Sequence, residues 1–539
     1  MYNSHIRILT SCIFALALSS CYEDLGNYDY HEVDEIRIDT AGTGILTNYA
    51  ITRFDSLTLK PNVYLNDQLV TDTDSAALSY QWTIYSAVAG AGTSLQTDTI
   101  GHERHLKAQI NRTGGSYYVQ LTVTNRANGL QQYFRTNVTV GEALDGGWMA
   151  IYERNDRPHS SDLALIINPW TKSYATNSRV YVNLYQLTNG NYLPGNPIRC
   201  MDIAVSLAGH NIVGLCTDST LVGVSDSGIE QVMGFSNFFN TAPAQQAPLW
   251  YSHHGNGGIS GQNSEILIND NRVYTNTYFM STTGERESRF GIAKYGDNIG
   301  ELAAWNAELA APLNYGVVVY DQTNKRFLYS PFESAQLEPF AAQDTDIAAF
   351  DVNNTGMTLL MGDWGTGSDR LLPYDYMLMT GGPKRWLAVA NFSSSAPDNT
   401  AIGVGLYDMS QLCPDVAEAT SIAASNVGSY IYYAAGSTLY NFAYDSGLPA
   451  EVAWQTGSEA EVITCIRLTK YYNTFYATNI MPSADNVVHI ATWNDATREG
   501  RIYQYRINAA SGELDTSTSY TYSIPGKVKD MAWKYTMSN

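Results

Sequence analysis

Short apolar and aromatic runs, separated by turn-forming residues, recur from Asp145 to the end of the chain. Examples are "WMAIYE", "LALIINP", "YVNLYQL", "YGVVVYD" and "RIYQYRI", divided by clusters such as "TNGN", "GHN" and "AASG". Runs of this length and composition, bounded by Gly and Asn, predict strands joined by tight turns. No convincing helix is expected here. The pattern therefore restricts the chain to an all-β fold.

The number of these strands favours one closed architecture for residues 145–539. A β-propeller arranges four-stranded sheets in a ring, and at about 50 to 56 residues per blade this length predicts seven or eight blades. The repeat is loose, and the Gly-His…Trp-Asp signature of better-known propellers is missing. A string of sandwiches is the competing architecture. We place it below the propeller because no proline-rich linker divides the segment.

Residues 31–142 carry a second pattern, a strict alternation of apolar and polar residues in short runs such as "SLTLKPNVYL". Alternation with a period of two predicts half-buried strands, and about 100 residues of them around a central Trp82 predict a β-sandwich. The runs "YQWTIY" and "YYVQLTVTN" resemble PKD and related Ig-like domains. Trp82 is therefore expected in the core of this domain.

Composition excludes some classes of function. The chain has 539 residues, 44% of them hydrophobic, with a formal net charge of −21. It is long enough for two or more domains with sizeable cores. A nucleic-acid partner is not expected, since no basic patch offsets the phosphate charge.

The first residues predict where the protein works. The apolar run Ile6–Leu18 is too short to span a bilayer and has the features of a secretory signal, here residues 1–20. The stretch "LSSC" that ends at Cys21 resembles the lipobox of bacterial lipoproteins, in which this cysteine is lipidated. Glu23 and Asp24 resemble the acidic tag that sends such proteins to the outer face of the outer membrane. Residues 21–30 would then be the lipidated tether.

Two of the six cysteines could form a disulfide. Cys200 and Cys216 flank a segment that predicts two strands around a turn, and opposed positions on such strands can be bridged. Two buried free thiols are at least as good an interpretation. No cysteine or histidine spacing suits a metal, and neither a metal nor a cofactor is expected.

The motifs together resemble one family. The stretch "CYEDLGNYDY", Cys21 to Tyr30, and the later Gly147 and Trp148 match the PKD-like lipoproteins of Bacteroidetes. The run Phe350 to Asp363 resembles another of the family's blade starts. The resemblance implies an accessory surface lipoprotein beside a SusC-like transporter and a SusD-like lipoprotein, helping to capture oligosaccharides or oligopeptides. It implies no catalytic residue.

Known catalytic motifs are missing from the sequence: it contains no GxSxG, HExxH, Walker or dinucleotide motif. Paired carboxylates of a glycosidase depend on their separation in space, so they cannot be recognised here. No catalytic residue is predicted.

Two aromatic stretches are the candidate ligand sites, "APLWYSHHGNGGISG" and "GDWGTGSDRLLPYDY". Both are expected to be exposed loops, where binding residues of a rigid scaffold tend to lie. Aromatic faces could stack on sugar rings or peptide side chains, with His and Asn as hydrogen-bonding partners. Packing of these aromatics between blades is the alternative for each one. The candidates are Trp250, Tyr251, His253, His254, Asn256, Trp364, Tyr374 and Tyr376.

Three functions follow as hypotheses. The first is a non-catalytic surface protein that captures an oligomer for an importer. The second is a surface propeller hydrolase or lyase that acts on polysaccharide. The third is a structural subunit that docks on the transporter and binds no nutrient.

Overall fold

The computed structural model describes most of the chain and divides it into two compact units. The first comprises Met1–Ile51, Asp55–Ile110 and Gly114–Val140, and the second comprises Thr52–Phe54, Asn111–Thr113 and Gly141–Asn539. The predicted signal, Cys21 and the tether lie outside the described residues. The described residues are 34–71, 77–88, 97–141, 144, 146–172, 175–203, 212–255, 262–279, 289–308, 316–331, 334–367, 373–392, 399–470 and 482–534.

The first unit is built from antiparallel sheets around one core. Its longest strands, β9 (Gly115–Asn125) and β10 (Gln131–Gly141), pair along their length and alternate buried and exposed residues. Trp82 is completely buried and donates its indole N–H to the carbonyl of Glu103 at 2.9 Å, so its prediction as a core residue is confirmed. The other strands are β1 (Ile36–Asp39), β2 (Asn48–Thr52), β3 (Ser56–Leu59), β4 (Asn62–Leu65), β5 (Gln68–Leu69), β6 (Leu78–Ser86), β7 (Thr97–Gly101) and β8 (Leu106–Gln109).

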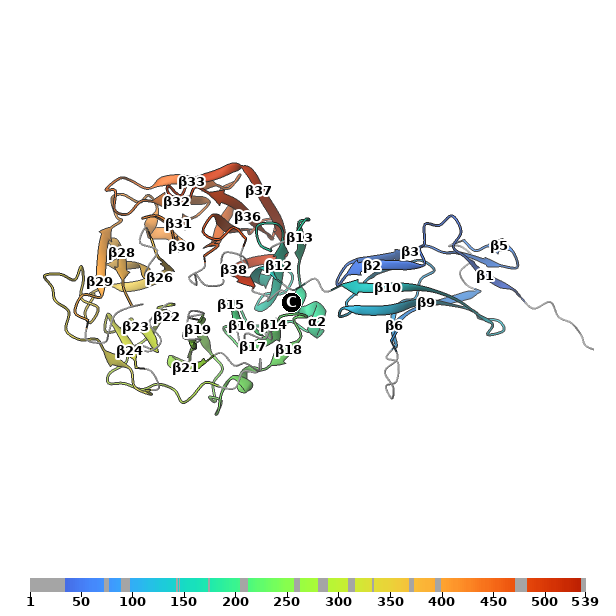
Figure 1. Cartoon of the computed structure of the whole chain (residues 1–539), viewed down its shortest axis with the longest axis horizontal. Coiled ribbons are helices and arrows are strands. Elements are labelled where there is room, and N and C mark those ends of the chain that lie inside the picture. Colours follow the sequence, from blue (N-terminus) through green and yellow to red (C-terminus); the bar gives the residue numbers. More distant parts are fainter. Residues whose placement is uncertain are drawn as a thin grey trace, which may run out of the picture. The chain divides into compact units, whose positions relative to one another are not determined.

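The second unit is a ring of antiparallel sheets, as Figure 1 shows. Among the described residues there are seven sheets, six built from consecutive strands and one built from both ends of the unit. The prediction of an all-β chain is confirmed, and the arrangement is propeller-like. The consecutive sheets are β15 (Pro197–Ile203), β16 (Ile212–Thr217), β17 (Leu221–Ser225), β18 (Gln231–Met233); β19 (Pro248–Gly255), β20 (Gln262–Asn269), β21 (Arg272–Phe279); β22 (Leu302–Asn306), β23 (Val317–Asp321), β24 (Arg326–Ser330), β25 (Glu338–Pro339); β26 (Thr358–Gly365), β27 (Tyr374–Gly381), β28 (Lys384–Ala390), β29 (Gly403–Asp408); β30 (Ala419–Ala424), β31 (Ile431–Ala435), β32 (Thr438–Phe442), β33 (Glu451–Gln455); and β34 (Glu461–Leu468), β35 (Val487–Asn494), β36 (Glu499–Ile507), β37 (Leu514–Ile524).

The ring closes because the last strand joins the first sheet. β38 (Gly526–Lys534) pairs with β11 (Gly147–Arg154), with Trp533 opposite Trp148. The first strand of each consecutive sheet contacts that of the next, and β38 contacts both β34 and β15, so the circuit is complete. The sheet continues outward through β12 (Ser160–Ile167) to β13 (Arg179–Tyr181), with β14 (Leu193–Pro194) also on β12.

One predicted strand is wrong. The run "YVNLYQL" leaves β13 and forms the short helix α2 (Leu184–Asn189). Its first N–H groups are satisfied from outside, because Asp162 on β12 accepts the backbone N–H of Tyr185 at 2.9 Å. Gly190 ends the helix with φ of 72°, a conformation that suits glycine. Two 3₁₀ turns, Phe235–Phe238 and Val416–Glu418, complete the helical structure of the described residues, none of whose helices is both long and apolar enough to cross a membrane.

A buried histidine packs beside the closing sheet. His489 on β35 is completely buried, and its ring stacks on Trp148 with centroids 3.6 Å apart. Gln504 donates to Nδ1 at 3.0 Å, since its own amide oxygen accepts from Asn168. The ring is therefore neutral, with Nε2 donating to the Thr469 hydroxyl at 3.0 Å. Burial lowers its pKa well below the ordinary value.

We expect this histidine to make the ring sensitive to mild acid. The unfolded chain takes up the proton below about pH 6.5 while the folded chain does not, so stability falls as pH falls below that value. Between pH 6.5 and 5 the loss is about 2 kcal/mol. Thermal unfolding at pH 7 and pH 5 measures it. The difference should shrink in His489→Gln and persist in His159→Asn, which changes an exposed histidine. Equal shifts in both variants would contradict the assignment.

Candidate functional site

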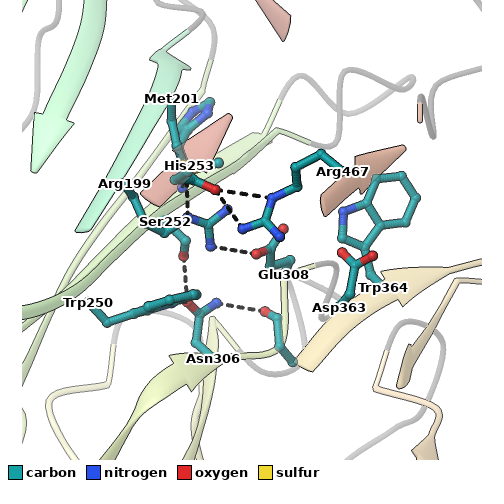
Figure 2. A network of polar contacts seen from close by, with 12 residues as sticks. Arg199, Met201, Trp250, Ser252, His253, Asn306, Glu308, Asp363, Trp364 and Arg467 are labelled. Carbon is teal, nitrogen blue, oxygen red and sulfur yellow. Dashed lines mark hydrogen bonds and ion pairs between the residues drawn. The ribbon is translucent and has the colours of Figure 1, made fainter. Parts of the chain in front are cut away.

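Charged side chains gather where the innermost strands of the ring meet (Figure 2). All come from β15, β26, β34 and β38, or from the residues that directly follow β22 and β34. Each is mostly buried, with side-chain exposure of 23% or less. We call this set the central polar cluster; it comprises Arg199, Glu308, Asp363, Arg467, Lys470 and Asp530.

Asp530 on β38 connects three strands. Its Oδ2 accepts from Nε of Arg199 at 3.4 Å and from the backbone N–H of Cys200 at 3.2 Å, both on β15. Its Oδ1 accepts from Nη2 of Arg467 on β34 at 2.5 Å. The Asp530 side chain is only 1% exposed. A buried carboxylate is tolerated when it is paired and hydrogen-bonded, and this one ties the closing strand to both of its neighbours.

Arg199 extends the cluster toward the next sheets. Its Nη1 donates to Oε1 of Glu308 at 2.6 Å, and its guanidinium lies over the ring of Trp250, 4.5 Å from the centroid. Burial alone would lower the pKa of Arg199, but Glu308 and Asp530 outweigh it and raise the pKa. Arg199 therefore stays charged.

A separate ion pair of the cluster joins Lys470 to Asp363 on β26. Its ammonium donates to Oδ2 of Asp363 and to the carbonyl of Trp364, and it lies 4.7 Å from the centroid of the Trp364 ring. Asp363 also accepts the backbone N–H of Ala424 at 2.8 Å. Burial lowers the pKa of Lys470, and Asp363 opposes that effect.

A further buried acid interacts with Glu308 of the cluster. Asp375 on β27 is 3% exposed. Burial and the nearby charge of Glu308 raise its pKa well above the ordinary value, although the Glu308 backbone N–H acts in the opposite direction. The six members of the cluster are three cations and three carboxylates, so their formal charges balance.

The candidate stretch around Trp250 is a strand. Pro248–Gly255 forms β19, so the prediction of a long exposed loop beginning there is wrong. Trp250 is half-buried and donates its indole N–H to Oδ1 of Asn306 at 2.8 Å, and the same oxygen accepts from the Ser252 hydroxyl at 2.5 Å. Trp250 is thus held in place beside Arg199.

The other candidates of this stretch do not all reach the cluster. Tyr251 is completely buried between sheets and donates its hydroxyl to Glu265 at 3.0 Å, so it is a core residue. His253 is 9% exposed, and its backbone N–H lies 3.2 Å from the sulfur of Met201. The side chain of His254 and all of Asn256 lie outside what the structure describes.

In the second candidate stretch, too, the tryptophan contacts the cluster and the tyrosines lie on a different strand. Trp364 on β26 is half-buried and contacts Lys470, whereas Tyr374 and Tyr376 belong to β27. Tyr376 is buried, and its hydroxyl lies 3.1 Å from that of Tyr444 in an aromatic contact with the next sheet. Packing between sheets, the alternative for each aromatic residue, applies to Tyr251 and Tyr376.

Of the two interpretations of Cys200 and Cys216, the structure agrees with buried free thiols and not with a disulfide. Cys200 and Cys216 are free and buried. Cys200 pairs with Leu215 in the register of β15 and β16, while Cys216 pairs with Arg199. Because successive side chains point to opposite faces, this one-residue offset sends the two thiols into different cores. Burial raises the pKa of both thiols, as expected for inert, structural cysteines.

The charged members of the central polar cluster were not among the residues predicted from the sequence. A usable signal was present: charged residues stand among apolar ones within strands, such as Arg199 in "PIRCMDI", Arg467 in "EVITCIRL" and Asp530 in "KVKDMAW". A charge in such a run is costly to bury unless it finds a partner. The partners lie far away along the chain, 109 residues for Arg199 and Glu308 and 63 for Arg467 and Asp530, which no local pattern shows. Within the described residues, no group of three or more His, Cys, Asp or Glu side chains could hold a metal.

Comparison with known proteins adds a family match for the beginning of the chain. Residues 21–197 match the family described as PKD-like, so that part of the predicted resemblance is confirmed. No curated protein matches.

Solved structures with similar folds are distant in sequence. A quinonprotein alcohol dehydrogenase-like protein from Bacteroides thetaiotaomicron is 10% identical, with a TM-score of 0.43, covering 94% of this chain and 100% of that one. Sqt1 from Saccharomyces cerevisiae is 10% identical, with a TM-score of 0.37, covering 74% and 98%. A mutant of the Synechocystis apocarotenoid oxygenase is 8% identical, with a TM-score of 0.35, covering 85% and 92%. What the chain does has to be inferred from its own side chains.

Proposed function

We propose that this protein is a lipid-anchored, non-catalytic binding component on the outer face of the outer membrane. It acts with a SusC-like transporter and a SusD-like lipoprotein and captures oligosaccharides or oligopeptides for import. The lipobox-like stretch that ends at Cys21 supports the anchor. The PKD-like match begins at that same residue and runs to residue 197.

Each unit has its own part in this proposal. The first unit is a PKD/Ig-like β-sandwich that serves as a spacer after the tether. The second is a seven-bladed propeller, in which every sheet of the ring counts as a blade and β38 completes the first one. A closed ring of radial sheets leaves only short, protected sheet edges, so it offers a rigid platform on which ligand contacts can be held in place.

The observation that carries the proposal is the central polar cluster with its two tryptophans. Trp250 and Trp364 are half-buried, and a cation lies over each ring, Arg199 on the first and Lys470 on the second. Half-buried aromatic rings beside charged groups are typical of sites that bind polar ligands. The charges in the cluster are paired with one another, which favours binding over covalent catalysis.

Retention of ligands by the purified lipoprotein tests this function. The full chain, solubilised in detergent and immobilised, is incubated with mixed plant oligosaccharides and with a peptide digest, and the bound and unbound fractions are analysed by mass spectrometry. We expect retention without new products. Trp250→Ala and Trp364→Ala should each lower retention about fivefold or more, since each removes one stacking face, worth about 1–2 kcal/mol.

The matched control is Trp386→Ala, which removes a half-buried tryptophan of β28 that lies beside Lys384 and outside the cluster. Wild-type retention in both site variants would contradict the assignment of the site. New products would favour the hydrolase or lyase, and neither retention nor products would favour a docking subunit.

A further inference from the structure

Four members of the central polar cluster form a chain of alternating charge. Arg467 pairs with Asp530, Asp530 with Arg199, and Arg199 with Glu308. The two inner side chains are 1% and 7% exposed, whereas the ends, Arg467 and Glu308, are 23% and 17% exposed. This series of side chains therefore has a positive end at Arg467 and a negative end at Glu308, and its two inner members are buried.

Both ends keep unused hydrogen-bonding capacity. Glu308 accepts from Arg199 through Oε1, and within the described part of the chain its Oε2 accepts no hydrogen bond. Each terminal nitrogen of Arg467 has two N–H groups and uses one, toward Asp530 or the carbonyl of Ile466. A carboxylate oxygen and two N–H groups thus remain for a ligand.

The charge of Glu308 acts on Arg467, although the two side chains form no ion pair. Burial lowers the pKa of Arg467, and the surrounding charges, Asp530 first and Glu308 among them, reverse the effect and raise it. Nevertheless no ion pair within 4.0 Å joins Arg467 to Glu308 in the described structure. Figure 2 shows the two side chains with Arg199, and Asp363 and Trp364 beside them. Opposite charges that stay apart in a mostly buried site can be bridged by a ligand that carries both signs.

The charge balance of the site limits what that ligand can be. The three cations and three carboxylates of the cluster balance one another, and the whole chain has a formal charge of −21. A purely anionic ligand is disfavoured by this field, and a purely cationic one offers no acceptor to the remaining N–H groups of Arg467. A neutral sugar satisfies hydrogen bonds but offsets neither charge. A ligand with one ammonium and one carboxylate satisfies both ends and preserves the balance.

We propose that the central polar cluster binds the free ammonium and carboxylate of an amino acid or short peptide, the ammonium at Glu308 and the carboxylate at Arg467. This inference rests on the proposed capture function and selects peptides over glycans as the ligand class. Charge-assisted hydrogen bonds at both ends give the site its selectivity.

Titration calorimetry with blocked and unblocked probes on the wild-type lipoprotein tests it. The probes are trialanine, N-acetyl-trialanine, trialanine amide, alanine, N-acetylalanine and maltotriose. We expect trialanine or alanine to bind, and the loss of either charged end to weaken binding at least tenfold. Binding of alanine as tightly as trialanine identifies a free amino acid as the ligand, and tighter binding of trialanine identifies a peptide.

Variants locate the contacts. Glu308→Gln should abolish the preference for a free ammonium but keep the preference for a free carboxylate, whereas Glu301→Gln, on an exposed residue before β22, should change neither. Thermal unfolding confirms that both variants fold. Arg467→Lys should retain binding of trialanine, weakened about tenfold, because Lys keeps the charge and loses the fork of donors.

The outcomes separate this inference from the proposed function. Three results would each overturn the zwitterion assignment and leave capture intact. They are equal binding of blocked and free peptides, binding of maltotriose alone, and no binding of any probe here while the retention assay finds a ligand. Absence of every ligand from the retention assay would overturn capture itself.

Discussion

Replacing Asp530 by Asn is expected to lower the free energy of unfolding by about 3–5 kcal/mol, the range for removing one partner of a buried ion pair. The variant keeps the shape of the side chain but removes the charge that Arg467 and Arg199 share. Because β38 joins both ends of the second unit, the loss acts at the point where the ring closes. The unfolding temperature should fall by roughly 5 °C or more.

Asp375→Asn is the matched control for this prediction. It is the same substitution at a buried acid of the same region, but Asp375 has a raised pKa because of burial and the neighbouring Glu308. A folded-state pKa above the unfolded one means that the wild type loses stability as pH rises through the folded pKa, while Asn does not titrate. Asp375→Asn should therefore be neutral or stabilising, increasingly so at higher pH. Thermal unfolding at pH 6 and pH 8 checks both variants, and equal losses in the two would contradict the role given to Asp530.

Trp148→Ala is expected to cost about 3–5 kcal/mol of stability, the range for truncating a large buried aromatic residue. Trp148 is 3% exposed, stacks on His489, and lies opposite Trp533 in the pairing that closes the ring. Trp148→Phe should recover part of the loss, because it keeps an aromatic ring in the same core. Chemical denaturation of the three proteins measures the effect.

The control for Trp148 is Tyr295→Ala, which truncates an aromatic residue that is 61% exposed. It should change the free energy of unfolding by no more than about 0.5 kcal/mol. If the two alanine variants were equally stable, the Gly-Trp motif, Gly147 and Trp148, would have some role other than stabilising the sheet that closes the ring.

The Gly-Trp motif shows how far the sequence could be interpreted. Its Gly147 has φ of 147°, and a Cβ there would lie 2.6 Å from the carbonyl oxygen of Ile166, so no other residue fits without displacement. The sequence marked this position as the entry to a new domain, and the structure places it at the start of β11. What the sequence could not show is that the partner strand of β11 lies almost four hundred residues away, at the other end of the chain.

The candidate site was predictable only in part, for the same physical reason. Trp250 and Trp364 stood out because large aromatics beside polar residues are visible in a local stretch. Whether such a residue faces the centre or a neighbouring sheet depends on strand alternation and register, so Tyr251 and Tyr376 are buried between sheets instead. The register likewise decided against a disulfide between Cys200 and Cys216.

By itself, the sequence determined the all-β character of the chain, because the period of two and the turn residues are local properties of neighbouring residues. It also determined that Trp82 is a core residue of an alternating domain. Only the tertiary structure decided the central polar cluster, since Arg199, Glu308, Arg467 and Asp530 meet through strands distant in sequence. The energy of a buried charge depends on partners in space, and closure of the ring is what brings those partners together.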